Sequence, residues 1–147
     1  MSPTSRPDPE ILPRALAIVG SGMITSVGLS SPATCAAMRA GISAFTETRF
    51  MNSIGEWIIG SSVPMDPPLR GLPKLAYFAA SAIRECLNSV GSLNPQSVPV
   101  LLCVAEQERP GRFTGLDDLL LPQLQSLLGF RFHPLSKVIP HGRVGGA

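Results

Sequence analysis

The chain has 147 residues, of which 44% are hydrophobic and only 15% are charged. This length is sufficient for one domain with a hydrophobic core, but the charged fraction lies well below the roughly 25% that is usual for soluble proteins. The formal net charge of +2 is too small to indicate a nucleic-acid surface. Together with a mean hydropathy of +0.25, these values favour a domain that hides part of its surface against a partner.

The N-terminal residues exclude several targeting signals. Residues 1–13 contain four prolines and predict a flexible leader, which leaves residues 14–147 as a single domain. The apolar stretch 15–29 is too short to span a membrane and is interrupted by Gly, Ser and Thr. Pro7 to Glu10 precede it, which is unlike a signal peptide. We therefore expect a cytoplasmic protein without membrane contact.

The first predicted elements are a strand, a glycine-containing loop and a short helix. Residues 15–20 are an apolar run of the strand type, and Gly20, Gly22 and Gly28 lie in the loop that follows. The helix is expected over residues 32–40, because Ser30 and Ser31 can accept hydrogen bonds from free backbone amides and Pro32 suits a first turn. Gly41 is a typical helix stop.

The middle of the chain continues this alternation. Residues 56–63 predict a peripheral strand, since Gly60 and two serines interrupt it. A proline-rich loop over 65–73 follows. Apolar residues then recur at helical spacing over residues 72–90, and Gly91 ends that predicted helix.

The last third predicts two strands and one helix. Residues 98–105 are continuously apolar, which is typical of a strand buried on both faces of a parallel sheet, with Pro99 near its beginning. A polar loop over 106–115 leads to a leucine-rich helix at 116–128, and residues 137–139 form a short strand candidate. The order of elements indicates an α/β fold with a parallel or mixed sheet.

Several of these residues lie in an order that resembles a known family. The pattern is an apolar strand, then Gly-x-Gly, then Thr-x-x-Gly, and then a helix ending in Ala-Gly-x-Ser-x-Phe. The residues that match it are Ile18, Gly20, Gly22, Thr25, Gly28, Leu29, Arg39, Ala40, Gly41, Ser43 and Phe45. This order is similar to the start of the β-ketoacyl-acyl-carrier-protein synthases, members of the thiolase superfamily. The resemblance implies the N-terminal half of a thiolase-like fold, a mixed and mostly parallel sheet with flanking helices. It gives Gly20, Gly22, Thr25 and Gly28 a structural role in the first loop.

The same resemblance implies that the chemistry of the family is absent. Those enzymes carry a nucleophilic cysteine where a central strand meets a buried helix, and their histidines come from the second half of the fold. The junction here is formed by Pro140, His141, Gly142 and Arg143. His141 stands where the thiol is expected, and Gly142 or Arg143 stand there if the alignment shifts. We expect no catalytic residue and lean towards a pseudoenzyme.

Other candidate sites are weak. Cys103 lies inside an apolar run and is expected to be a buried thiol, and Cys35 and Cys86 are expected to pack on helices. Three widely spaced cysteines argue against a disulfide framework or a zinc site, and His133 and His141 lack a third ligand nearby. The first loop lacks the third glycine of a dinucleotide fingerprint. We expect no metal and no cofactor.

Two further sets of side chains receive ordinary roles. Trp57 and Tyr77 are expected to pack, although exposed aromatics could anchor a partner. The basic residues of the last third are expected to form a solvated rim around an interface: Arg109, Arg112, Arg131, Lys137 and Arg143.

Three functions remain open. The first is a non-catalytic thiolase-like protein that acts through protein–protein contact or self-association, similar to accessory proteins of bacterial type VI secretion clusters, for which an adaptor or co-chaperone role in effector loading is inferred. The second is a fragment or subunit of a β-ketoacyl synthase-type acyltransferase, with acyl carrier protein as its partner. The third is a small-molecule binding domain that retains an acyl or pantetheine groove without turnover.

Overall fold

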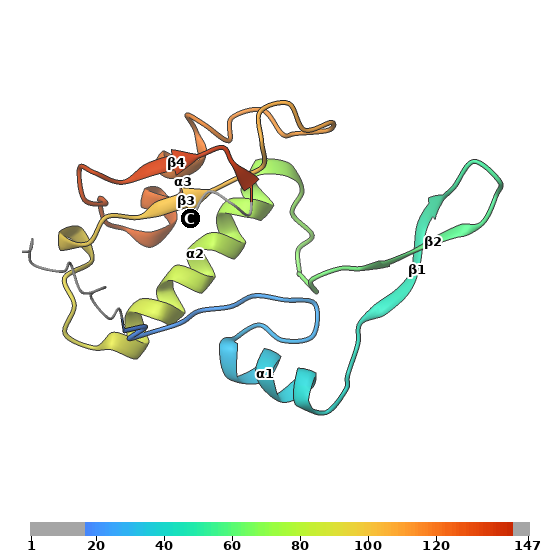
Figure 1. Ribbon diagram of the computed structural model, residues 1–147, viewed down its shortest axis with the longest axis horizontal. Helices are drawn as coiled ribbons and strands as arrows, with labels where there is room; N and C mark the ends of the chain where they lie inside the picture. The colour runs from blue at the N-terminus through green and yellow to red at the C-terminus, as the bar shows by residue number, and fades with distance from the viewer. Residues whose placement is uncertain (1–16, 143–147) are drawn as a thin grey trace, which may run out of the picture.

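The structure is a computed structural model that describes residues 17–142 (Figure 1). Its α-helices are α1 (Ser31–Arg39), α2 (Gly71–Val90) and α3 (Leu120–Leu128), and a 3-10 turn, η1, covers Pro95–Ser97. The strands are β1 (Phe45–Met51), β2 (Trp57–Ser61), β3 (Leu101–Cys103) and β4 (Lys137–Ile139). The proposed leader 1–13 lies outside the described residues.

The core lies where α2 packs against α3 and the end of β3. Ala76 and Ala80 are buried on α2, and their small side chains let Leu120 and Leu124 of α3 approach closely. Burying such apolar surface stabilises the fold by about 25 cal/mol per Å². The helical spacing of apolar residues therefore predicted both helices. It also predicted that α3 buries Leu120 and Leu124, but not that Ala76 and Ala80 are the residues that α2 buries.

The helix boundaries follow from local hydrogen bonding. α1 begins as expected, because Ser30 Oγ accepts a hydrogen bond from the Ala33 amide at 3.3 Å. α3 begins four residues later than the sequence predicts, since the Leu119 and Leu120 amides both donate to the Gly115 carbonyl oxygen. The preceding residues form turns instead of a regular helical ladder. α3 ends at Gly129, whose φ of 80° lies in the left-handed region.

β3 and β4 form a parallel two-stranded sheet, as the α/β pattern predicts. Leu101, Leu102 and Cys103 pair with Lys137, Val138 and Ile139. The expectation that this strand is buried on both faces is wrong. Leu102 packs on the core, but Leu101 is 55% exposed and Cys103 is also exposed. Within residues 17–142 the helices cover one face of this sheet. Because successive side chains of a strand point to opposite faces, Leu101 and Cys103 lie on the other face from Leu102.

The strand expected over residues 15–20 is not present where the structure describes it. Residues 17–20 have no regular secondary structure, and the side chains of Ile18 and Val19 are 93% and 73% exposed. A strand requires a neighbouring edge for its backbone hydrogen bonds, and within residues 17–142 no strand pairs with this segment. An apolar run is therefore not sufficient by itself to form a strand.

β1 and β2 form an antiparallel hairpin that projects away from the helices (Figure 1). The predicted peripheral strand is β2, whereas β1 was not predicted. Asn52 organises the turn, because its Oδ1 accepts hydrogen bonds from the Ile54 and Glu56 amides at 3.0 and 2.9 Å. Trp57 is 47% exposed on this hairpin, so the expectation that it is an ordinary packing residue is wrong. Tyr77, on α2, is similarly exposed.

The α/β class is therefore confirmed at a coarse level. The described residues form three α-helices and two separate two-stranded sheets, one parallel and one antiparallel. Because the two sheets do not join, the expected single, mostly parallel sheet is not formed within this part of the chain.

Candidate functional site

The glycine loop lies directly against α2. A Cβ at Gly22 would collide with the Ala82 carbonyl oxygen, and a Cβ at Gly20 would lie 2.6 Å from Ser89 Oγ and from Val90 Cγ2. At Gly22 the neighbouring atoms belong to the backbone of α2, so no side chain fits there, whereas at Gly20 the nearest atoms belong to side chains that would have to move. These two glycines therefore allow the loop to contact the helix.

Glu85 of α2 holds the same loop through its carboxylate. Glu85 Oε2 accepts a hydrogen bond from the Met23 amide at 2.8 Å, and Oε1 accepts one from the Ser31 amide at 2.7 Å. Ser31 opens α1, so the carboxylate also lies where the positive end of that helix favours a negative charge. Sequence reasoning missed this residue. Its signal was that Glu85 is the only acidic residue in the twenty-residue helix.

The end of the glycine loop is held by hydrogen bonds to the Gly28 carbonyl oxygen. The hydroxyls of Thr25 and Thr34 lie 3.1 Å apart, and both donate to the Gly28 carbonyl oxygen, at 3.3 and 3.1 Å. Thr34 is only 1% exposed, and a Cβ at Gly28 would lie 2.8 Å from Thr34 Cα. The polar groups of this network satisfy one another, which suits a structural loop better than a ligand cradle.

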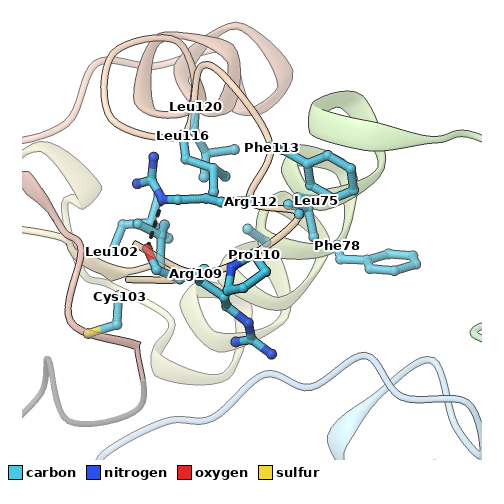
Figure 2. Close-up of a pocket in the computed structure, with 14 residues that line it drawn as sticks. Leu75, Phe78, Leu102, Cys103, Arg109, Pro110, Arg112, Phe113, Leu116 and Leu120 are labelled. Atoms are coloured by element: carbon cyan, nitrogen blue, oxygen red, sulfur yellow. Dashed lines mark hydrogen bonds between the residues drawn. The ribbon is translucent and has the colours of Figure 1, made fainter. Parts of the chain in front are cut away.

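A cavity of about 580 Å³ lies at the carboxyl end of β3, between α2, α3 and the loop that joins β3 to α3 (Figure 2). Carboxyl ends of parallel strands are frequent ligand sites. The walls are mostly apolar and include Leu75, Phe78, Leu102, Phe113, Leu116 and Leu120. The sequence did not predict this cavity, because it forms only where residues 75–79 of α2 lie against the later stretch 102–120.

Two arginines line this cavity, and they differ in how tightly their side chains are held by neighbouring groups. Arg112 forms two bonds to the Asp117 carboxylate, at 2.9 and 2.6 Å, and its Nε donates to the Ala105 carbonyl oxygen at 3.0 Å. The hydrogen bond to Asp117 also raises the pKa of Arg112. Arg109 has a long contact of 3.9 Å with Glu106 as its one side-chain ion pair within residues 17–142, and its side chain is 64% exposed. Arg109 thus fits the expected solvated rim, whereas Arg112 fastens the loop.

Cys103 lines the cavity from the end of β3, and its thiol is exposed. The prediction of a buried thiol is wrong, because only one face of the short sheet is covered. Cys35 and Cys86 are half-buried on α1 and α2, as expected.

The predicted nucleophile junction follows β4 directly. The Gly142 amide donates to the Val104 carbonyl oxygen at 2.8 Å, and a Cβ at Gly142 would collide with the Glu106 carboxylate. Pro140 and His141 precede it, and His141 is exposed. Arg143 lies outside the described residues. Within residues 17–142 no three His, Cys, Asp or Glu side chains cluster as metal ligands.

Comparison with protein-family models, with curated proteins and with solved structures gives no match. No helix among the described residues is long and apolar enough to cross a membrane.

Proposed function

We propose that this chain is a non-catalytic thiolase-like protein that acts through contact with other proteins. The observation that carries the proposal is the distribution of apolar side chains. Over residues 17–142, twenty-one large apolar side chains are exposed, whereas eight apolar residues form the buried core. Scattered exposed apolar residues are ordinary, but an excess of this size favours a protein that covers its surface with a partner.

The junction after β4 supports the non-catalytic part of the proposal. Covalent acyl transfer needs a nucleophile activated by a neighbouring base or by a helix N-terminus. Pro140, His141 and Gly142 supply no thiol there. Cys103 is exposed at the end of a strand, and none of the hydrogen bonds within residues 17–142 joins its thiol to a histidine. Among residues 17–142, no thiol therefore lies beside a base, which supports a non-catalytic protein.

The class of partner rests on the sequence resemblance. The resemblance suggests a role like that of the accessory thiolase-like proteins of bacterial type VI secretion clusters, and an adaptor or co-chaperone for a secretion effector would need open apolar surface. The exposed hairpin and the exposed segment around Ile18 and Val19 supply such surface.

The cavity beside β3 favours a second candidate. A mostly apolar cavity of about 580 Å³ has the size of a small-molecule site. It would suit a small-molecule binding domain with an acyl or pantetheine groove, or a subunit of a β-ketoacyl synthase-type acyltransferase that acts with acyl carrier protein.

The decisive experiment is capture of partners from the native host with the tagged chain. Recovery of a secretion effector or its chaperone supports the adaptor, and recovery of acyl carrier protein supports the alternative. The double variant Ile18→Ser/Val19→Ser tests the surface, because both side chains are exposed and no core contact is lost. A parallel thioester-exchange assay with acyl-carrier-protein substrates is expected to show no turnover. Turnover that Cys103→Ala abolishes would refute the non-catalytic proposal.

A further inference from the structure

The β1–β2 hairpin is exposed on both of its faces. Apart from Gly60 and Thr48, which are half-buried, its strand residues are exposed, including Phe45, Phe50 and Ile59. Isolated two-stranded hairpins are marginally stable in water, and a third strand or a packed face is usually required. The hairpin is therefore expected to be stabilised by packing or pairing with a further surface.

The two edges of this hairpin differ in their protection against strand addition. β1 carries Glu47 and Arg49, and its register shifts between Glu47 and Met51, so its edge is both charged and bulged. Charges and bulges are the features that keep natural edge strands from pairing. The sequence of β2, Trp-Ile-Ile-Gly-Ser, has no charge and no proline. Its outer edge is the open one.

The sequence of β2 is complementary to itself when it is read in the opposite direction. Antiparallel pairing centred on Ile59 places Ile59 opposite its own copy, Ile58 opposite Gly60, and Trp57 opposite Ser61. Each large side chain then faces a small one, except at the centre, where two β-branched side chains meet. Directly opposed side chains on one face lie about 4.5–5.5 Å apart, so such pairs decide the register of a sheet.

We propose that β2 is a self-association edge, and that two copies of this chain pair through it, antiparallel, about a twofold axis at Ile59. The result is a four-stranded sheet in the order β1, β2, β2 of the second copy, β1 of the second copy. The hairpin projects from the helices (Figure 1). The side chains of Trp57, Ile58 and Ile59 are exposed along β2, and only its last residue, Ser61, is hydrogen-bonded to the glycine loop, through Ser26. An isologous contact of this kind closes on itself and does not form fibres.

The interface is small, which sets the expected affinity. A five-residue ladder with its side chains covers less than the roughly 1,600 Å² of a standard stable interface. We therefore expect a dissociation constant in the range of about 10 to 100 µM, so that the dimer dissociates on dilution. The inference extends the proposed function, because it names the partner of one apolar surface.

The test is sedimentation equilibrium of the whole chain from about 1 to 500 µM, a range that brackets micromolar dissociation constants. The unaltered chain is expected to pass from monomer to dimer. Ile59→Lys and Ile59→Glu should each weaken the dimer about tenfold or more, because like charges meet directly at the twofold axis. An equimolar mixture of the two variants should restore dimerisation, because Lys then faces Glu. Ile54→Lys is the matched control, since Ile54 is exposed in the turn of the same hairpin.

Each outcome decides the proposal. A chain that stays monomeric throughout, a dimer that Ile59→Lys leaves intact, or a mixture that fails to associate more strongly than either variant alone overturns it. Restored dimerisation also shows that both variants fold. A monomer that still captures a secretion effector refutes this pairing but supports the proposed function. A dimer that captures no partner supports this pairing but counts against the proposed function.

Discussion

Replacing Glu85 tests whether one carboxylate joins the glycine loop to α2. Its two oxygens accept hydrogen bonds from the Met23 and Ser31 amides at 2.8 and 2.7 Å. A hydrogen bond to a charged group contributes about 1.5–3 kcal/mol, and an amide left buried without a partner costs about 1–3 kcal/mol. Because both amides are only partly buried and can regain water, we expect Glu85→Ala to lower the free energy of unfolding by about 2–4 kcal/mol. A domain of this size has about 5–15 kcal/mol in total.

Glu85→Gln should fall between the wild type and Glu85→Ala. Its amide keeps the shape and one acceptor oxygen, but presents an N–H₂ group to one of the two donors, so a loss of about 1–3 kcal/mol is expected. The assay is urea unfolding followed by far-UV circular dichroism, which reports the helices. Fluorescence is less suitable, because the single tryptophan, Trp57, lies on the hairpin.

Glu108→Ala is the control for the loss of one negative charge. Glu108 is exposed in the loop after β3, and a substitution there should change stability by less than about 0.5 kcal/mol. If Glu85→Ala and Glu108→Ala unfold at the same urea concentration, the carboxylate does not hold the loop and the reasoning is refuted.

Three further substitutions or reactions test the remaining features. Gly22→Ala should destabilise the protein more than Gly41→Ala in the same urea assay, because the first forces a side chain into the backbone of α2 while the second costs only the about 1–2 kcal/mol of a positive φ; equal losses would contradict the close approach. Iodoacetamide should alkylate Cys103 in the native protein well before Cys86, as followed by peptide mass spectrometry, since only the former is exposed; the reverse order would mean that the face of β3 is covered. Arg112→Lys should increase proteolytic cleavage between β3 and α3, because lysine cannot reproduce both bonds to Asp117 and the bond to the Ala105 carbonyl; an unchanged cleavage rate would show that the loop is held by other contacts.

The sequence by itself determined the elements that depend on neighbouring residues. The apolar spacing along α2 and α3, the serine cap of α1, and the glycines that follow the helices are local signals, because a helix forms its hydrogen bonds within four residues. The short strand β4 was also predicted with its observed bounds. The sequence also placed Gly20 and Gly22 in a structural loop, but it did not predict that this loop packs against α2.

Only the tertiary structure decided which strands pair and which surfaces remain open. A strand bonds to a distant segment, so the apolar residues 17–20 have no partner among the described residues, whereas the mixed polar sequence of β1 pairs with β2 across a turn. The role of Glu85 likewise depends on donors 54 and 62 residues away. Cys103 is exposed because helices cover one face of a two-stranded sheet. Composition predicts that apolar surface must be covered, but the folded chain alone shows that much of it lies on a projecting hairpin with an open edge.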